Sequence, residues 1–465
     1  MWELKNRTNL IIINDSILDN TAGDTYSSFF INNLNSLGYH VSKITIIPSD
    51  IRIVSQEIFS ANKECDITLI LSNLSNGVVG QALGMLFEKK LEKKEQLEQF
   101  LNKKNISFKE TETMYPACVN VLEGEKYPLI HIQRLFLIDE KYMDSIFRSV
   151  LKPYLKKFNE PIAFEKMADI YLNGNSGELE NLEYNQVKFQ LTKNTDNSVL
   201  IEYKSEDLDS LLQFEEALRH LVFISYSKPV LHDSLYLDSN LLVKNAIQVI
   251  ETCFEKYGPE NTFLSFNGGK DCTVLLHITI AVLEKLFPLY SQKLICLYVQ
   301  EDRPFKEQEE FIDKCQEYFN LELVTLKMNI KEALTIILKD RPNLKACLMG
   351  TRKTDPFSQS LLEFQDQELN SLKKNCLQLT DQDYPEVMRV NPLLDWSYYH
   401  IWDYLLYYKV PYCMLYNMGY TSLGNIDNTV KNPHLLCKDF FNENEKYLPA
   451  YKLLQEGSER IGRNR

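Results

Sequence analysis

A pair of glycines marks the point where a short apolar run gives way to a long helical pattern. Residues 262–266 are mostly strand formers, and apolar residues recur at helical spacing over 274–286, so Gly268 and Gly269 lie at a strand-to-helix turn. There, free backbone N–H groups and the positive end of the helix dipole point at one place. Glycine also lets phosphate oxygens approach the backbone closely. The junction therefore predicts a phosphate-binding loop, to which Lys270 adds a mobile positive charge.

Two other interpretations of the paired glycines are open. The Walker-type nucleotide loop has glycine where Leu264 stands and Ser or Thr where Asp271 stands, so the chain departs from it at both positions. A simple turn without a ligand is the second alternative. The strand before the glycines and the helix after them favour the phosphate loop.

Length and composition fit a globular protein of two or three domains. The chain has 465 residues, of which 44% are hydrophobic and 25% charged, and its net charge is −13. The acidic balance argues against a nucleic-acid partner, because phosphate backbones are bound chiefly through Lys and Arg. No segment approaches the ~20 apolar residues that cross a bilayer, and the start of the chain lacks a secretory apolar core. We therefore expect a cytoplasmic protein without a membrane or nucleic-acid partner.

The ten cysteines include no Cys-x-x-Cys pair, which disfavours a zinc ribbon, a redox pair and a disulfide framework. Several, such as Cys296 and Cys347, lie inside apolar runs. We expect buried thiols in a reducing compartment.

The first half of the chain alternates strands and helices. The expected strands span residues 10–13, 41–47 and 67–71, and the expected helices 26–37 and 51–59. This order predicts an α/β domain with a mainly parallel sheet flanked by helices. The Lys- and Glu-rich stretch 87–104 is expected to form one solvent-exposed helix.

A polar, mixed composition over residues 173–205 predicts a small strand-rich appendage, and a helical segment follows at 211–221. We place a domain boundary next to it, which gives a first domain at residues 1–225 and a second at 226–465.

The second half is a run of β-α units and predicts another mainly parallel sheet flanked by helices. The expected strands span 262–266, 293–300, 321–328 and 344–349, and the expected helices 272–286, 306–318 and 330–338. In such sheets the ligand lies at the carboxyl ends of the strands. Asn267, Gln300 and Gly350 are therefore expected to share one rim.

The loop after the strand that ends at Met349 is rich in groups suited to an anionic ligand. Arg352 can direct two donors onto a phosphate, and Asp355 can accept from a ribose or a flavin ring, or from a magnesium-bound water. A polar loop without a ligand is the alternative. Farther along, aromatic residues at helical spacing over 401–406 are expected to be core.

Several motifs of the second half, taken together and in order, resemble the eukaryotic FAD synthases, which are FMN adenylyltransferases of the PAPS reductase-like, adenine nucleotide α-hydrolase type. The resemblance covers about the last 230 residues. The motifs are Asn267–Cys272, Met349–Pro356, Asn391–Trp396, Gly419–Gly424, Asn428–Pro433 and Glu459–Arg463.

The resemblance implies that AMP is transferred from ATP to FMN, giving FAD and pyrophosphate, with magnesium as the cofactor. The FMN phosphate attacks the ATP α-phosphorus, so catalysis is mainly alignment and charge stabilisation. ATP and FMN would be the small-molecule partners, and FAD would pass to apoflavoproteins through transient contact.

The resemblance also implies roles for individual residues. Asn267 would hold the magnesium. The residues carried over as catalytic are Asn267, Asp271, Asp355, Arg460 and Arg463. Those carried over as binding the nucleotide or the flavin are Ser265, Gly268, Gly269, Lys270, Gln300, Gly350, Arg352, Asp381, Arg389, Asp395 and Trp396. One departure is the stretch 361–379, which is longer than the family's usual spacer.

The first half has a weaker resemblance to the molybdopterin-binding-like domain that precedes the synthase in animal FAD synthases. Residues 11–18 and 128–136 carry it. Members that hydrolyse FAD have a glycine-rich, acidic loop after the third strand, whereas residues 71–77 here lack both the paired glycines and the paired aspartates. We predict a non-catalytic domain.

Three competing functions stay open. A PAPS reductase, or another ATP-dependent enzyme with this pyrophosphate loop, shares the fold, but a reductase needs a cysteine near the C-terminus, where Cys437 is the last candidate. A tRNA-thiolating enzyme would be expected to have a basic surface and paired cysteines. A degenerate nucleotide-binding module is the non-enzyme alternative.

Overall fold

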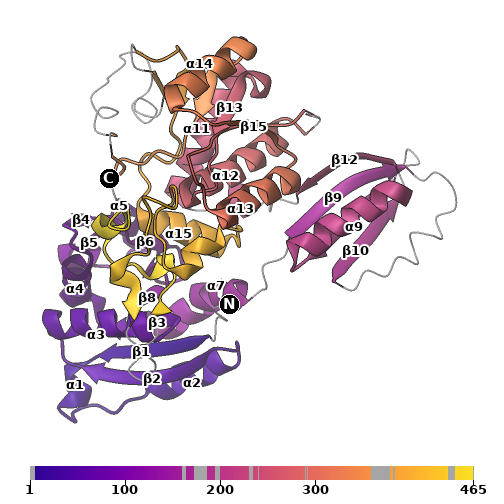
Figure 1. Cartoon of the computed structure of the whole chain (residues 1–465). Helices are drawn as coiled ribbons and strands as arrows, with labels where there is room; N and C mark the ends of the chain where they lie inside the picture. Colours follow the sequence, from indigo (N-terminus) through magenta and orange to yellow (C-terminus); the bar gives the residue numbers. More distant parts are fainter. Residues whose placement is uncertain are drawn as a thin grey trace.

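The computed structural model describes residues 6–463 except 160–163, 172–185, 194–198, 222, 230–233, 239, 289, 291, 357, 359–376, 381–382 and 438–445. Its described residues form three larger sheets, shown in Figure 1. The first and third are mainly parallel and are flanked by helices, which confirms the predicted α/β class. The second is antiparallel and carries one helix.

The first sheet has six strands in the order β2-β1-β3-β8-β7-β6. Its strands are β1 (Arg7–Ile13), β2 (His40–Ile47), β3 (Ile67–Ser72), β6 (Asn120–Leu122), β7 (Leu129–Ile132) and β8 (Leu135–Asp139). The neighbouring strands from β2 to β8 pair in parallel. β7 pairs antiparallel with β8, and β6 pairs antiparallel with β7. β3 is buried along its whole length, which agrees with its mostly apolar sequence. The larger flanking helices are α2 (Tyr26–Asn35), α3 (Ile51–Glu64), α4 (Val78–Phe87) and α7 (Lys152–Asn159), with the short α1 (Asp15–Leu18) and α6 (Met143–Ile146) beside them.

The single helix predicted over residues 87–104 is wrong. α4 ends at Phe87, because Glu88 takes a left-handed conformation with a φ of 53°. A short strand, β4 (Leu91–Lys93), then pairs with β5 (Met114–Pro116), and the helix α5 begins only at Glu95 and ends at Lys103. Strand pairing with a distant segment overrides the local preference of Lys and Glu for helix.

The second sheet has the order β10-β11-β9-β12. Its strands are β9 (Phe164–Tyr171), β10 (Val187–Lys193), β11 (Val199–Ser205) and β12 (Phe223–Pro229), and its helix is α9 (Leu208–Leu221). This unit contains the described part of the strand-rich appendage predicted over 173–205, and Figure 1 shows it projecting beside α13. The predicted boundary between residues 225 and 226 falls inside β12.

The third sheet has the order β15-β14-β13-β16-β18-β17. Its strands are β13 (Thr262–Ser265), β14 (Ile295–Val299), β15 (Glu322–Leu326), β16 (Ala346–Leu348), β17 (Leu377–Leu379) and β18 (Met388–Val390). Its larger helices are α11 (Leu241–Tyr257), α12 (Lys270–Leu286), α13 (Lys306–Tyr318), α14 (Ile330–Asp340) and α15 (Tyr398–Tyr407), and the short α10 (Ser234–Leu237) precedes α11. β14 lies next to β13 and β15 lies beyond β14, whereas β16, the next strand in the sequence, pairs with the opposite side of β13. That reversal opens a crevice at the carboxyl ends of β13 and β16, where ligands bind in such sheets.

The C-terminal segment lies between the first and third sheets, as the yellow ribbon in Figure 1 shows. Lys452 is buried there, its Nζ donates to the carbonyl of Cys65 at 2.7 Å, and its own carbonyl accepts from Nδ2 of Asn62 at 3.2 Å. Lys89 of the first half forms an ion pair with Glu456 at 2.8 Å. The C-terminal segment therefore packs against the first half of the chain, at the end of α3 and just after α4.

Candidate active site

The loop between β13 and α12 has the backbone geometry that a phosphate group requires. Gly268 has a φ of +70°, and a Cβ there would lie 2.9 Å from Cγ1 of Ile312, so glycine alone fits. Asn267 turns its Oδ1 back to accept from the backbone N of Gly269 at 3.0 Å. Gly269 is the N-cap of α12, so the positive end of this helix lies at the carboxyl end of β13.

A second glycine lets the loop after β16 pack on the same helix terminus. A Cβ at Gly350 would lie 3.1 Å from backbone atoms of Asp271 and Cys272. The loops at Asn267 and Gly350 are therefore neighbours, as expected for residues that follow adjacent parallel strands.

A cavity of about 390 Å³ lies beside these two loops. Three parts of the sequence bring predicted residues to it: Ser265, Asn267, Gly269, Lys270 and Asp271 from the first loop, Gly350 and Asp355 from the second, and Arg460 and Arg463 from the C-terminal tail. Further polar lining residues are Glu301, Tyr416, Ser422 and Glu459.

A cluster of alternating charges forms one side of the cavity. Nζ of Lys270 binds Asp271 at 3.1 Å and Glu459 at 2.5 Å. The guanidinium of Arg352 lies 3.0 Å from Asp271, 3.1 Å from Asp355 and 2.7 Å from Glu459. Arg460 adds a third cation, 3.2 Å from Asp355.

These contacts correct two predictions about the cations. The side chain of Lys270 is only 2% exposed, so it is not a mobile charge. Arg352 is fully buried, and its guanidinium is held by carboxylates instead of pointing freely into the cavity. The two side chains fix the loops and the tail relative to one another.

The cluster determines the ionisation of its members. Burial acts to raise the pKa of Asp271, but Arg352 and Lys270 outweigh it and the pKa lies below its usual value. Burial acts to lower the pKa of Arg352, and the carboxylates of Asp271, Glu459 and Asp355 outweigh it, so that pKa lies well above its usual value. Both groups are therefore charged at neutral pH.

The tail that carries Glu459, Arg460 and Arg463 is held by two of the motifs found in the sequence. Thr421 donates from its Oγ1 to the carbonyl of Glu459 at 2.6 Å, and Asn432 donates from its Nδ2 to the carbonyl of Ser458 at 2.7 Å. Arg463 donates to the carbonyl of Leu423. These motifs thus position the tail, a role that the sequence did not predict.

The remaining predicted residues, Gly268 and Arg352 among them, do not line this cavity. Gln300 donates to Glu309 at 2.6 Å, Arg389 donates to the carbonyl of Leu379 at 3.1 Å, and Asp395 forms an ion pair with Lys353. Trp396 faces a different cavity, which α15 lines. Asp381 lies outside the described residues.

Sequence reasoning missed Glu459 and Tyr416. Glu459 stands in the quoted Glu-Arg-x-Gly-Arg motif, so its charge was a signal that could have been used. Tyr416 accepts from the backbone N of Lys270 at 2.9 Å through its hydroxyl. No local pattern identifies that contact, because 146 residues separate the two.

The thiols near the site are inert. Of the nine cysteines that the structure describes, eight are buried and Cys437 is half-buried, and all are free. Burial raises the pKa of Cys272, the thiol next to the phosphate loop, to about 12. No helix in the described part of the chain combines the length and apolarity needed to cross a membrane.

The chain is similar to known proteins in sequence and in structure. The model of the phosphoadenosine phosphosulfate reductase domain matches residues 261–431. A probable FAD synthase of Schizosaccharomyces pombe is 37% identical over 224 residues, which span 47% of this chain and 77% of the relative. A probable FAD synthase of Caenorhabditis elegans is 28% identical over 532 residues, covering 98% of this chain and 96% of the relative. The crystal structure of Candida glabrata FMN adenylyltransferase with FMN and the ATP analogue AMPCPP matches at 28% identity with a TM-score of 0.42, over 49% of this chain and 92% of that one.

The matched domain thus has the PAPS reductase type of α/β fold, with its phosphate loop at the topological switch point. Within that class, the family follows from the 37% identity to the Schizosaccharomyces pombe protein, 77% of whose length is matched. The chain belongs to the FAD synthase family.

Proposed function

We propose that this protein transfers AMP from ATP to FMN and releases pyrophosphate, forming FAD. One observation carries the proposal: the phosphate loop, the Gly350–Asp355 loop and the Arg460–Arg463 tail, all part of the motifs shared with FAD synthases, line a single cavity. Relatives named as probable FAD synthases match the chain along nearly its whole length.

The proposed mechanism uses alignment and charge. The triphosphate lies along Gly269 and the N-terminus of α12, near Lys270. There its oxygens would replace Oδ1 of Asn267 and the hydroxyl of Tyr416, which accept from the backbone N–H groups of Gly269 and Lys270. Arg460 and Arg463 face it from the tail and neutralise the charge that builds on the leaving group. The FMN phosphate supplies the nucleophile, so the enzyme needs no reactive thiol, in agreement with the raised pKa of Cys272.

Magnesium is part of the proposal. Among the described residues no group of three or more His, Cys, Asp and Glu side chains is arranged to hold a metal. Magnesium in nucleotide sites uses one or two carboxylates together with phosphate oxygens, so Asp355 and Glu301, which line the cavity, fit this mode. The Oδ1 of Asn267 already accepts from Gly269 and Cys272, and the carboxylate of Asp355 accepts from Arg352 and Arg460. Magnesium would therefore compete with these donors at either residue. Bound magnesium would polarise the phosphates.

The first half, residues 1–225 in the predicted division, is proposed to be non-catalytic. In the loop after β3, backbone N–H groups are satisfied internally: Leu74 N binds Asp139 and Ser75 N binds Asn73. This loop also lacks the paired glycines and the paired aspartates of the members that hydrolyse FAD. We also propose a cytoplasmic location, supported by the free cysteines, and transient delivery of FAD to apoflavoproteins.

A PAPS reductase is the runner-up function. It requires a reactive cysteine, and Cys437 is the one described cysteine that is not fully buried. Replacing Cys437 with Ser should leave FAD formation unchanged.

Flavin fluorescence tests the proposal. With FMN, ATP and magnesium, the fluorescence should fall as FAD forms and stacks on itself, and FAD should be recovered by chromatography. Replacing both Arg460 and Arg463 with Ala should slow this change at least tenfold, whereas Arg148→Ala, a matched change on the exposed surface of the first half, should not. Unchanged fluorescence with the wild-type protein would refute the proposal.

A further inference from the structure

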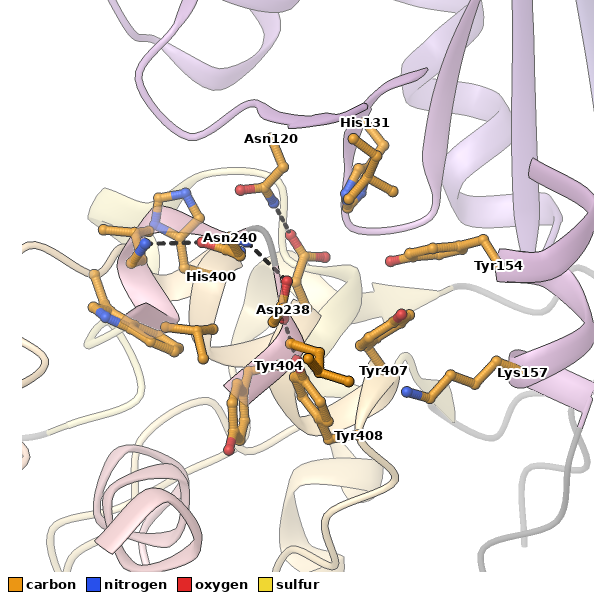
Figure 2. A pocket seen from close by; sticks show the side chains of 16 residues that line it. Asn120, His131, Tyr154, Lys157, Asp238, Asn240, His400, Tyr404, Tyr407 and Tyr408 are labelled. Carbon is orange, nitrogen blue, oxygen red and sulfur yellow. Dashed lines mark hydrogen bonds between the residues drawn. The ribbon is translucent and has the colours of Figure 1, made fainter. Parts of the chain in front are cut away.

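A second cavity, of about 330 Å³, lies between the first half of the chain and α15 (Figure 2). Asn120, His131, Tyr154 and Lys157 reach it from the first half. α15 and the start of α11 supply the opposite wall. It shares no described lining residue with the phosphate-loop cavity, so it is a separate site.

Aromatic rings form much of the wall. Tyr154 stacks on Tyr407 with ring centroids 5.0 Å apart, which joins the two halves. Tyr407 and Tyr408 meet edge to face at 5.0 Å, and Tyr404 packs on Tyr408 at 4.6 Å. Aromatic rings along the wall of a cavity of this size suit a flat ligand.

Polar groups stand at intervals among the rings. The Tyr154 side chain is more than nine-tenths buried, and Figure 2 shows its hydroxyl directed into the cavity without a hydrogen bond to the other lining residues. Asp403 accepts from Nδ2 of Asn120 at 2.7 Å, and burial raises the pKa of this carboxyl well above its usual value. A protonated Asp403 can both donate and accept.

The charges of the lining residues disfavour a phosphorylated ligand. Lys157 is the one Lys or Arg among the described lining residues, and its Nζ lies 3.9 Å from the ring centroid of Tyr407. Burial lowers the pKa of His131 to about 4 and that of His400 to about 3, so both are neutral. Asp238, which binds the hydroxyl of Tyr408, adds a carboxylate that repels anions.

We propose that this cavity is a binding site for an uncharged, planar heteroaromatic molecule that carries N–H and C=O groups on its edge and no phosphate. The ring lies against the tyrosines, and its edge meets Tyr154 and Asp403. Because the walls come from both halves, the bound molecule also holds the halves together. The inference does not depend on the proposed function.

Riboflavin and lumichrome are suitable probes, since both are uncharged, planar and fluorescent. Binding is measured by the change in their fluorescence on titration with the full chain. Leu242→Trp fills the cavity from its half-buried lining position, whereas Leu241→Trp makes the same change at the preceding residue, which is 62% exposed and does not line the cavity. Tyr407→Leu, which removes a ring from the wall, is a second variant.

The expected result is saturable binding of at least one probe by the wild-type protein and by Leu241→Trp, with at least tenfold weaker binding by Leu242→Trp and by Tyr407→Leu. The thermal unfolding midpoint of Leu242→Trp should match that of Leu241→Trp, which shows that the variant is folded. Binding that Leu242→Trp leaves unchanged places the probe elsewhere and overturns the proposal. So does the absence of saturable binding of either probe to the wild-type protein.

Discussion

Glu459, six residues before the last residue of the sequence, accepts a hydrogen bond from Nζ of Lys270 in the phosphate loop. The same carboxylate binds Arg352 in the loop after β16. One acidic side chain thus ties together the three segments that line the cavity. The phosphates of ATP are also anionic and could bind the cation of Lys270, and this leads to the first prediction.

Replacing Glu459 with Gln should destabilise the free protein, because it leaves Lys270 and Arg352 with one carboxylate fewer in a buried cluster. Removal of one partner of a buried ion pair typically costs about 3–5 kcal/mol. ATP should recover part of this loss, since its phosphates can neutralise the same cations. Thermal unfolding should therefore show a lower Tm without ATP and a larger rise of Tm with ATP than in the wild-type protein.

Glu456→Gln is the matched control for this change. Glu456 is also a buried acid of the tail, but its ion pair is with Lys89 of the first half, away from the phosphate loop. This variant should lose stability without an enhanced response to ATP. Equal ATP responses in both variants would contradict the role given to Glu459.

Gly268→Ala should damage the phosphate loop. The residue has a φ of +70°, which costs an alanine about 1–2 kcal/mol, and the new Cβ would press on Ile312. We expect weaker ATP binding and slower FAD formation, measured by titration and by flavin fluorescence. In Gly457→Ala the added Cβ meets no atom within 4 Å, so this variant should behave as the wild-type protein does. Normal ATP affinity in Gly268→Ala would rule out the loop as the phosphate site.

Asn432→Ala should loosen the tail. The buried Asn432 side chain donates to the carbonyl of Ser458 and to the hydroxyl of Thr421. Its loss removes two buried hydrogen bonds, each worth about 0.5–1.5 kcal/mol, and allows Arg460 to shift. Turnover of FMN should fall by roughly ten- to hundredfold, since misplacement by about 1 Å can have effects of this size. Asn329→Ala removes the N-cap of α14 and should reduce stability without changing turnover.

Local patterns were sufficient to predict the strand, glycine turn and helix around Gly268, because strand, turn and helix preferences act over a few residues. The shared rim of Asn267 and Gly350 followed from the general rule for parallel sheets. The burial of Arg352 could not be predicted, since its partner Glu459 is 107 residues away in the sequence. The helix predicted over residues 87–104 failed for the same reason, as the strand β4 exists only through pairing with β5.

The contact between Lys452 and Cys65 spans 387 residues, and it too has no local signature. It leads to a prediction about pH. Burial, with a further contribution from Arg134, lowers the pKa of Lys452 to about 7 from an ordinary value near 10.5. Between these two values the unfolded chain binds a proton that the folded protein does not, so raising the pH through this range stabilises the folded state. Below pH 7 both states are protonated, and the destabilisation is fully present.

Lys452→Met removes this titration. The free energy of unfolding of the wild-type protein, minus that of the variant, should therefore rise between about pH 6 and about pH 9.5. Urea unfolding at the two pH values measures it, and taking the difference cancels the other titrating groups that the two proteins share. Lys103→Met, a change at an exposed position of α5, should give a difference that does not vary with pH. A flat difference for Lys452→Met as well would mean that Lys452 keeps its proton when folded, and that the junction between the two ends of the chain is more polar than its packing indicates.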